Sequence, residues 1–103
     1  MLNYYNPFLA AWLSGNRDLA QQSAGLQVVL NGIIGSAAGG SGATVADVAT
    51  AFHSTDFSIS AGSSVPTNVT FICAYTWMCI RGDIHANDAG YALIGRTVVA
   101  RLG

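Results

Sequence analysis

The feature that most constrains this chain of 103 residues is a long amphipathic stretch that begins at Asn16. Asn16 is a good helix N-cap, and Asp18 stands in the first turn, where a carboxylate complements the helix dipole. A Gly-Gly-Ser-Gly cluster at residues 39–42 marks the end of the pattern. The apolar residues that recur at helical spacing on one face are Leu19, Leu26, Leu30, Ile33, Ile34 and Ala37. The pattern predicts one long helix.

Two short apolar segments are typical of strands. Leu2–Tyr5 is stopped by the turn residues Asn6-Pro7, and Thr44–Val48 continues into a turn or helical turn that reaches His53. Phe8–Leu13, between the first segment and the long helix, has room for one or two helical turns. The sequence therefore predicts a short strand on either side of the long helix.

The second half of the chain predicts one more regular element. Residues 54–70 are rich in Ser, Thr and Gly and predict a loop, and residues 71–80 predict partly buried irregular structure. Asn87 can cap a helix over Asp88–Leu102, whose apolar stripe includes Tyr91 and Ile94. The order strand, helix, strand, loop, helix predicts a single α/β domain, residues 1–103, with a short parallel sheet and two principal helices.

Composition excludes several classes of protein. Only 9% of the residues are charged, with no Lys and no Glu, and the net charge of −1 excludes a basic grip on nucleic acid. A hydrophobic content of 51% excludes disorder. No run of 18 apolar residues is present, so we expect no membrane span. The first residues lack a basic region, so we expect no signal peptide, and localisation stays open.

Two cysteines, Cys73 and Cys79, are six residues apart. No second Cys pair or spaced His pair accompanies them, so no zinc site is expected, and no cofactor motif was found. Two interpretations remain open from the residues alone. The pair forms a local disulfide if the chain is made in an oxidising compartment, or both are buried thiols that act as small hydrophobic groups.

One segment, Gly82 to Tyr91, carries the residues best suited to chemistry. It places His85 just before the helix cap Asn87 and beside the carboxylate of Asp83. Carboxylate or backbone acceptors in such a loop can fix the imidazole tautomer while the ring faces a cleft. The arrangement suits a general base, although a lone loop His is more often a surface or capping residue.

A wider match accompanies this segment. Asp-Ile-His-Ala-Asn-Asp-Ala-Gly-Tyr-Ala-Leu-Ile-Gly, residues 83–95, resembles the last conserved block of the SGNH (GDSL-type) ester hydrolases, which supplies their catalytic His. Three further stretches resemble secreted actinobacterial-type members in the same order. They are residues 3–7, residues 30–52 and Cys-Ala-Tyr-Thr-Trp-Met-Cys at 73–79. The resemblance implies a partial three-layer, flavodoxin-like α/β/α unit, a Cys73–Cys79 disulfide and a secreted origin.

The resemblance covers only the C-terminal half of such an enzyme. The family's Gly-Asp-Ser nucleophile block and its oxyanion-hole residues have no counterpart here, and no Gly-x-Ser-x-Gly elbow is present. The family's acid stands three residues before the His, a position that holds Gly82. Either Asp83 or the Gly82 carbonyl would therefore orient His85.

The resemblance leaves the nucleophile unknown. The loop serines Ser54, Ser58, Ser60, Ser63 and Ser64 are the candidates. Ser54 stands beside His53 and near Asp56, but adjacent side chains diverge and rarely reach triad geometry.

Two functions follow as hypotheses. The first is a carboxylic ester hydrolase acting on small esters, with His85 as general base. The second is a catalytically inactive α/β fragment that associates with itself. In the family the strand matching Leu2–Tyr5 lies inside a sheet, and its upstream neighbours are missing here, so unpaired edges and apolar surface predict a homo-oligomer.

Overall fold

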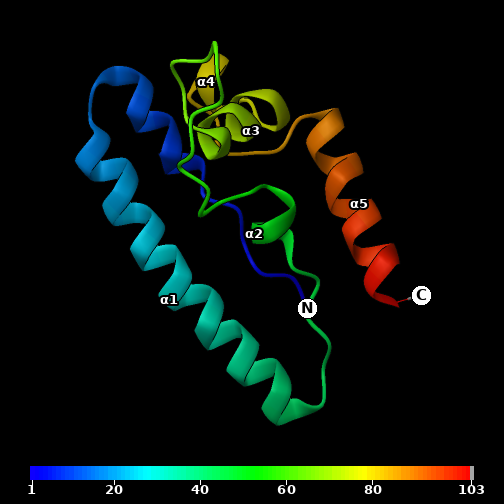
Figure 1. The fold of residues 1–103 in the computed structure, drawn as a ribbon. Helices are drawn as coiled ribbons and strands as arrows, with labels where there is room; N and C mark the ends of the chain where they lie inside the picture. The colour runs from blue at the N-terminus through cyan, green and yellow to red at the C-terminus, as the bar shows by residue number, and fades with distance from the viewer. Residues whose placement is uncertain (103) are drawn as a thin grey trace.

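The computed structural model describes residues 1–102 as a mostly helical molecule (Figure 1). About 64% of the chain is helical and 4% lies in isolated bridges, and residues 1–102 contain no sheet. The elements are the 3₁₀ helix η1 (Pro7–Ser14) and the helices α1 (Arg17–Ser41), α2 (Val48–Ala51), α3 (Thr67–Tyr75), α4 (Met78–Arg81) and α5 (Asp88–Leu102). The α/β prediction, and with it the flavodoxin-like architecture of the SGNH enzymes, is wrong.

The two predicted strands do lie side by side, but they pair at one point only. Leu2 and Ala46 form a parallel bridge, in which the amide of Asn3 donates to the carbonyl of Ala46. On the other side of the first segment, the backbone N–H and C=O of Tyr4 bond to the side-chain amide of Asn31 in α1. Because a side chain satisfies the groups that a next strand would use, the pairing does not grow into a sheet.

Helices α1 and α5 flank the molecule, with the N-terminal segment and α2 between them (Figure 1). Helix α3 packs on both η1 and α5, and α2 packs on α5. The core is small and lies where η1, α2 and α3 meet. Its buried members are Leu9, Ala24, Val48, Phe52, Val69 and Ile72. The aromatic ring of Phe52 stacks on Tyr5 at 4.6 Å and meets Tyr75 edge-on at 5.9 Å, which ties the N-terminal segment to α3.

Helix α1 has the predicted caps but buries an unexpected face. The side chain of Asn16 accepts from the amide of Leu19, and Gly42 ends the helix in the left-handed conformation at φ 74°. The residues of α1 that are buried are Ala20, Ala24 and Ala38. Leu26, on the predicted apolar face, is 73% exposed. Small side chains and Asn31, rather than the leucines, face the rest of the molecule.

The second half is more helical than the sequence predicted. Helices α3 and α4 lie where the sequence predicted a loop over residues 54–70 and irregular structure over residues 71–80. Pro66 precedes α3 in extended conformation, a starting signal that the surrounding Ser and Thr residues obscured. The helical turn after Val48 is confirmed as α2, and α5 has the predicted bounds. No helix within residues 1–102 has the length and apolar character needed to cross a bilayer.

Candidate functional site

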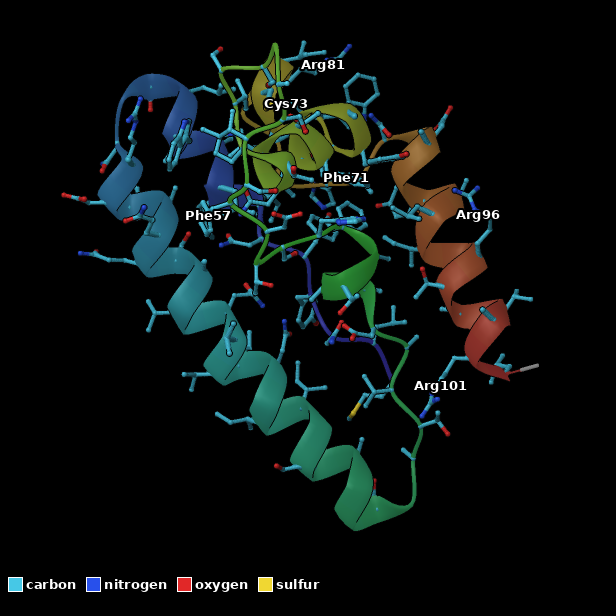
Figure 2. The ribbon with its side chains drawn as sticks, viewed as in Figure 1. Phe57, Phe71, Cys73, Arg81, Arg96 and Arg101 are labelled. Atoms are coloured by element: carbon cyan, nitrogen blue, oxygen red, sulfur yellow. A yellow bond between two sulfur atoms is a disulfide. The ribbon has the colours of Figure 1, made fainter. Side chains whose placement is uncertain are left out.

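A disulfide closes a ring of residues just before the segment that carries His85. The predicted disulfide is confirmed: Cys73 of α3 and Cys79 of α4 are bonded, with 5.1 Å between their Cα atoms. Cys73 lies at the top of the molecule in Figure 2, where α3 and α4 meet. Helix α4 then ends at Gly82, whose φ of 65° turns the chain back. The ring and the turn together fix where the His85 segment starts.

The segment next runs antiparallel to the residues that join α3 to α4. Thr76 and Ala86 form a bridge, with the amide of Trp77 donating to the carbonyl of His85 at 3.0 Å. Asn87 then caps α5, because its Oδ1 accepts from the amide of Gly90 at 2.9 Å. Backbone bonds on both sides of His85 therefore hold the segment in place.

Asp83 and His85 form a hydrogen-bonded pair. Oδ1 of Asp83 accepts from the backbone amide of His85 at 2.9 Å and lies 2.5 Å from its Nδ1. The His85 side chain is 70% exposed. In the neutral ring this contact places the proton on Nδ1 and leaves Nε2 as the acceptor that faces solvent. Of the two partners that the sequence left open, the structure places Asp83, and not the Gly82 carbonyl, against Nδ1.

The surroundings keep the Asp83 carboxylate charged and hold the segment in position. Hydrogen bonds from the backbone and then from the ring of His85 lower the pKa of Asp83, so the carboxylate stays charged in mildly acidic solution. The hydroxyl of Tyr5 donates to the carbonyl of Ile84 at 2.8 Å. Burial above all, and next the nearby Tyr91, raises the pKa of Tyr5, so its hydroxyl remains a neutral donor.

The candidate serines do not join this pair. Within residues 1–102, no hydroxyl of Ser54, Ser58, Ser60, Ser63 or Ser64 is hydrogen-bonded to His85. Ser58 donates to Asp56, whose pKa this hydroxyl lowers, and Ser63 donates to the carbonyl of Val65. Oγ of Ser54 is buried without a partner. The structure thus presents an Asp–His pair that no loop serine contacts.

A second cluster lies in the same molecule. His53, Ser54 and Asp56 line one cavity of about 290 Å³. His53 has a left-handed backbone, φ 52°, which is uncommon outside glycine. Its Nδ1 stands 4.0 Å from Asp56, beyond hydrogen-bond range, and its ring packs on Phe71 at 4.4 Å. These three residues share a cavity but not the contacts of a triad.

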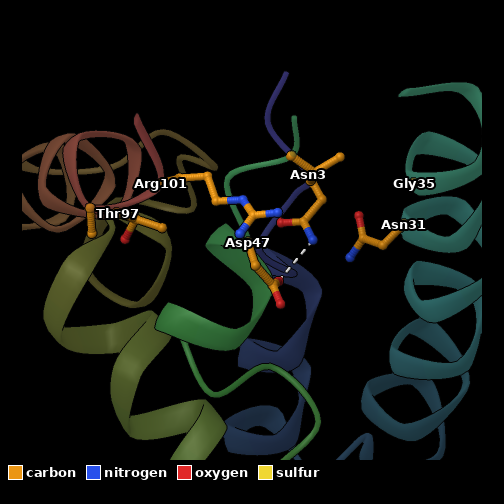
Figure 3. A pocket seen from close by; sticks show the side chains of 8 residues that line it. Asn3, Asn31, Gly35, Asp47, Thr97 and Arg101 are labelled. Atoms are coloured by element: carbon orange, nitrogen blue, oxygen red, sulfur yellow. Dashed lines mark hydrogen bonds between the residues drawn. The ribbon is translucent and has the colours of Figure 1, made fainter. Parts of the chain in front are cut away.

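Sequence reasoning missed a cavity of about 540 Å³ between α1, α5 and the N-terminal segment, whose lining includes Asn3, Asp47 and Arg101 (Figure 3). Asn3 donates to Asp47 across it at 2.8 Å, and Arg101 extends toward them from α5. Arg96 on the same helix points outward (Figure 2). Asp47 also caps α2 by accepting from the amide of Thr50 at 3.1 Å. Its carboxylate therefore has a structural role as the cap of α2.

Within residues 1–102, no three His, Cys, Asp or Glu side chains lie close enough together to hold a metal ion.

Comparisons with protein-family models, with curated proteins and with solved structures find no match to this chain. The geometry of the Asp83–His85 pair is the observation that bears on the role of His85.

Proposed function

We propose that this protein hydrolyses small carboxylic esters, with His85 as the general base. The observation that carries the proposal is the contact of 2.5 Å between Oδ1 of Asp83 and Nδ1 of His85. The same Asp83 oxygen accepts the backbone amide of His85, so the carboxylate and the ring are fixed relative to each other. A base needs a defined tautomer and an accessible second nitrogen, and this pair supplies both.

The attacking group in this proposal is water, because the His85 ring is exposed and no loop serine within residues 1–102 is bonded to it. Water oxygen bonds to the ester carbonyl carbon while its proton passes to Nε2 of His85. The tetrahedral intermediate then breaks its bond to the alkoxide, which takes the proton back from the imidazolium. A positioned base of this kind accelerates a reaction by about 10²- to 10⁴-fold, so activated esters with small acyl groups are the expected substrates.

The chain offers a matched control for the test. His53 also stands near a carboxylate, but Asp56 is 4.0 Å away. We expect turnover of an aryl acetate to be lost in His85→Gln, reduced in Asp83→Asn and unchanged in His53→Gln. Equal turnover in the first and last of these variants would contradict the proposal.

Fluorophosphonate labelling followed by peptide mapping separates water attack from a serine mechanism. With water as nucleophile, the active protein gains no label. A label on any loop serine would identify that serine, and not water, as the nucleophile. The alternative, a self-associating protein without catalysis, predicts no turnover above that of the His85→Gln variant.

A further inference from the structure

One face of α1 carries an apolar stripe that is largely exposed. We define the α1 stripe as the leucine and isoleucine residues Leu19, Leu26, Leu30 and Ile33, all of them exposed. Leu26 and Ile33 expose 73% and 62% of their surface. No charged residue follows Asp18 in α1. Helix α1 makes its main contacts with η1, so most of its length stands against no other helix (Figure 1).

The molecule exposes more surface than a compact monomer of its mass. Its accessible surface is 6016 Å², against about 5,500 Å² expected for a folded chain of 10.6 kDa. Its radius of gyration is 13.9 Å, against about 12.8 Å for this length. The excess accessible surface of roughly 500 Å² approaches the roughly 800 Å² that each partner contributes to a stable interface. Helix α1, which is long and packs mainly on η1, accounts for the larger accessible surface and the larger radius of gyration.

We propose that the α1 stripe pairs with the α1 stripe of a second copy of this chain, in an antiparallel arrangement about a two-fold axis at Leu26. Leu19, Leu26 and Ile33 are spaced seven residues apart, so these three members of the stripe are symmetric about Leu26. An antiparallel copy then sets Leu26 on Leu26 of the partner subunit. It also sets Leu19 against Ile33 of the partner subunit. A self-complementary patch of this kind closes into a dimer.

The sides of α1 next to the stripe are open as well. Gly25 and Gly32, about 100° round the helix from Leu26 and Ile33, are exposed, and no atom lies within 4 Å of the place where either would carry a side chain. The antiparallel arrangement also sets each helix N-terminus near the C-terminal half of its partner, which opposes the two helix dipoles favourably. A membrane surface fits less well, because helices that bind there carry Lys and Arg along the polar face and α1 has only Arg17.

Sedimentation equilibrium of the full chain tests the pairing. We expect a concentration-dependent mass that approaches twice 10.6 kDa. Leu26→Arg should weaken association by about 30-fold or more, the effect expected at the centre of an interface. Ile80→Arg is the matched control, since Ile80 is 75% exposed on α4, and it should leave the mass unchanged. Circular dichroism of both variants checks that they fold. A constant mass of one chain, or equal effects of the two substitutions, would overturn the proposal.

Cysteine cross-linking tests the direction of the pair, because the chain has no free thiol of its own. Oxidation of Leu26→Cys should give a covalent dimer. Leu19→Cys alone should not cross-link, whereas its mixture with Ile33→Cys should. Cross-linking of Leu19→Cys with itself would contradict the antiparallel arrangement. This interface does not depend on the ester-hydrolase proposal, and loss of dimer with retained turnover would separate the two.

Discussion

Gly90 lies against the backbone of Tyr75 so closely that a Cβ atom at position 90 would stand 2.0 Å from the Tyr75 carbonyl oxygen. That carbonyl already accepts the amide of Asn87. The first turn of α5 therefore docks on the end of α3 through backbone contact, which only a glycine permits. The same contact places Asn87, and so the segment of His85, beside α3.

Gly90→Ala should therefore destabilise the fold. The clash is with backbone, which cannot move as the end of a side chain can, so we expect a loss of about 2 kcal/mol or more. Gly95→Ala in the same helix is the control, because open space surrounds that position. It should stabilise by about 0.5–1 kcal/mol, the helix preference of Ala over Gly. Urea unfolding followed by circular dichroism measures both, and a stabilising Gly90→Ala would refute the close packing.

Asp47→Ala should destabilise the fold in a pH-dependent way. The Asp47 carboxylate caps α2 and accepts from Asn3, so its loss should cost about 1–2 kcal/mol near neutral pH. Burial pulls the pKa of Asp47 upward, but hydrogen bonds from Thr50 and Asn3 outweigh it, and the net pKa lies below the ordinary value of 3.8.

The sign of the pH effect follows from this lowered pKa. The pKa of Asp47 is lower in the folded state than in the unfolded state, so the charged carboxylate stabilises the fold. This contribution to the unfolding free energy is complete above pH 3.8 and is lost as the pH falls through the folded pKa. The difference in unfolding free energy between wild type and Asp47→Ala should therefore shrink in strong acid. A difference that stays constant down to that range would contradict the role of the charge.

The two long helices could be predicted because their signals are local. Asn16 and Gly42 bound α1, and Asn87 caps α5, each through bonds within a few residues. The bounds of α3 were missed because its first turn, Thr-Asn-Val-Thr, has the composition of a loop, and only Pro66 marks the start.

The sheet and the buried face of α1 could not be predicted because they depend on distant partners. A strand pattern at Leu2–Tyr5 does not tell how many neighbours the strand has, and here Asn31 takes the place of one. The small residues Ala20 and Ala24 then bring α1 close to the N-terminal half. The apolar periodicity identified a helix correctly but not the side that packs.

Part of the candidate site could be predicted from the sequence, because some of its contacts are local in the chain. Asp83 and His85 are two residues apart, so their pairing is a local event, as is the Cys73–Cys79 bond. The hydrogen bond from Tyr5 to Ile84 joins residues 79 positions apart in sequence, and no pattern in the sequence predicted it.

Reduction of the Cys73–Cys79 disulfide should destabilise the protein by about 2 kcal/mol, because the short ring restricts the unfolded chain. The double variant Cys73→Ala, Cys79→Ala gives the same comparison without reductant. The unfolding free energies of the oxidised, reduced and double-variant proteins measure the effect. If the reduced and double-variant proteins are as stable as the oxidised one, the ring does not support the His85 segment.

Tyr5→Phe should loosen the His85 segment while the core remains packed. The ring still stacks on Phe52, but the donor to the Ile84 carbonyl is lost, at a cost of about 1 kcal/mol. We expect faster hydrogen exchange at the amide of Trp77, which donates to the His85 carbonyl, and little change at amides inside α1. Tyr4→Phe is the control, because Tyr4 is exposed and only its backbone is bonded to α1. Uniformly faster exchange over the whole molecule would assign Tyr5 to general packing, whereas a change confined to residues 76–87 would establish its hydroxyl as the anchor of the proposed base.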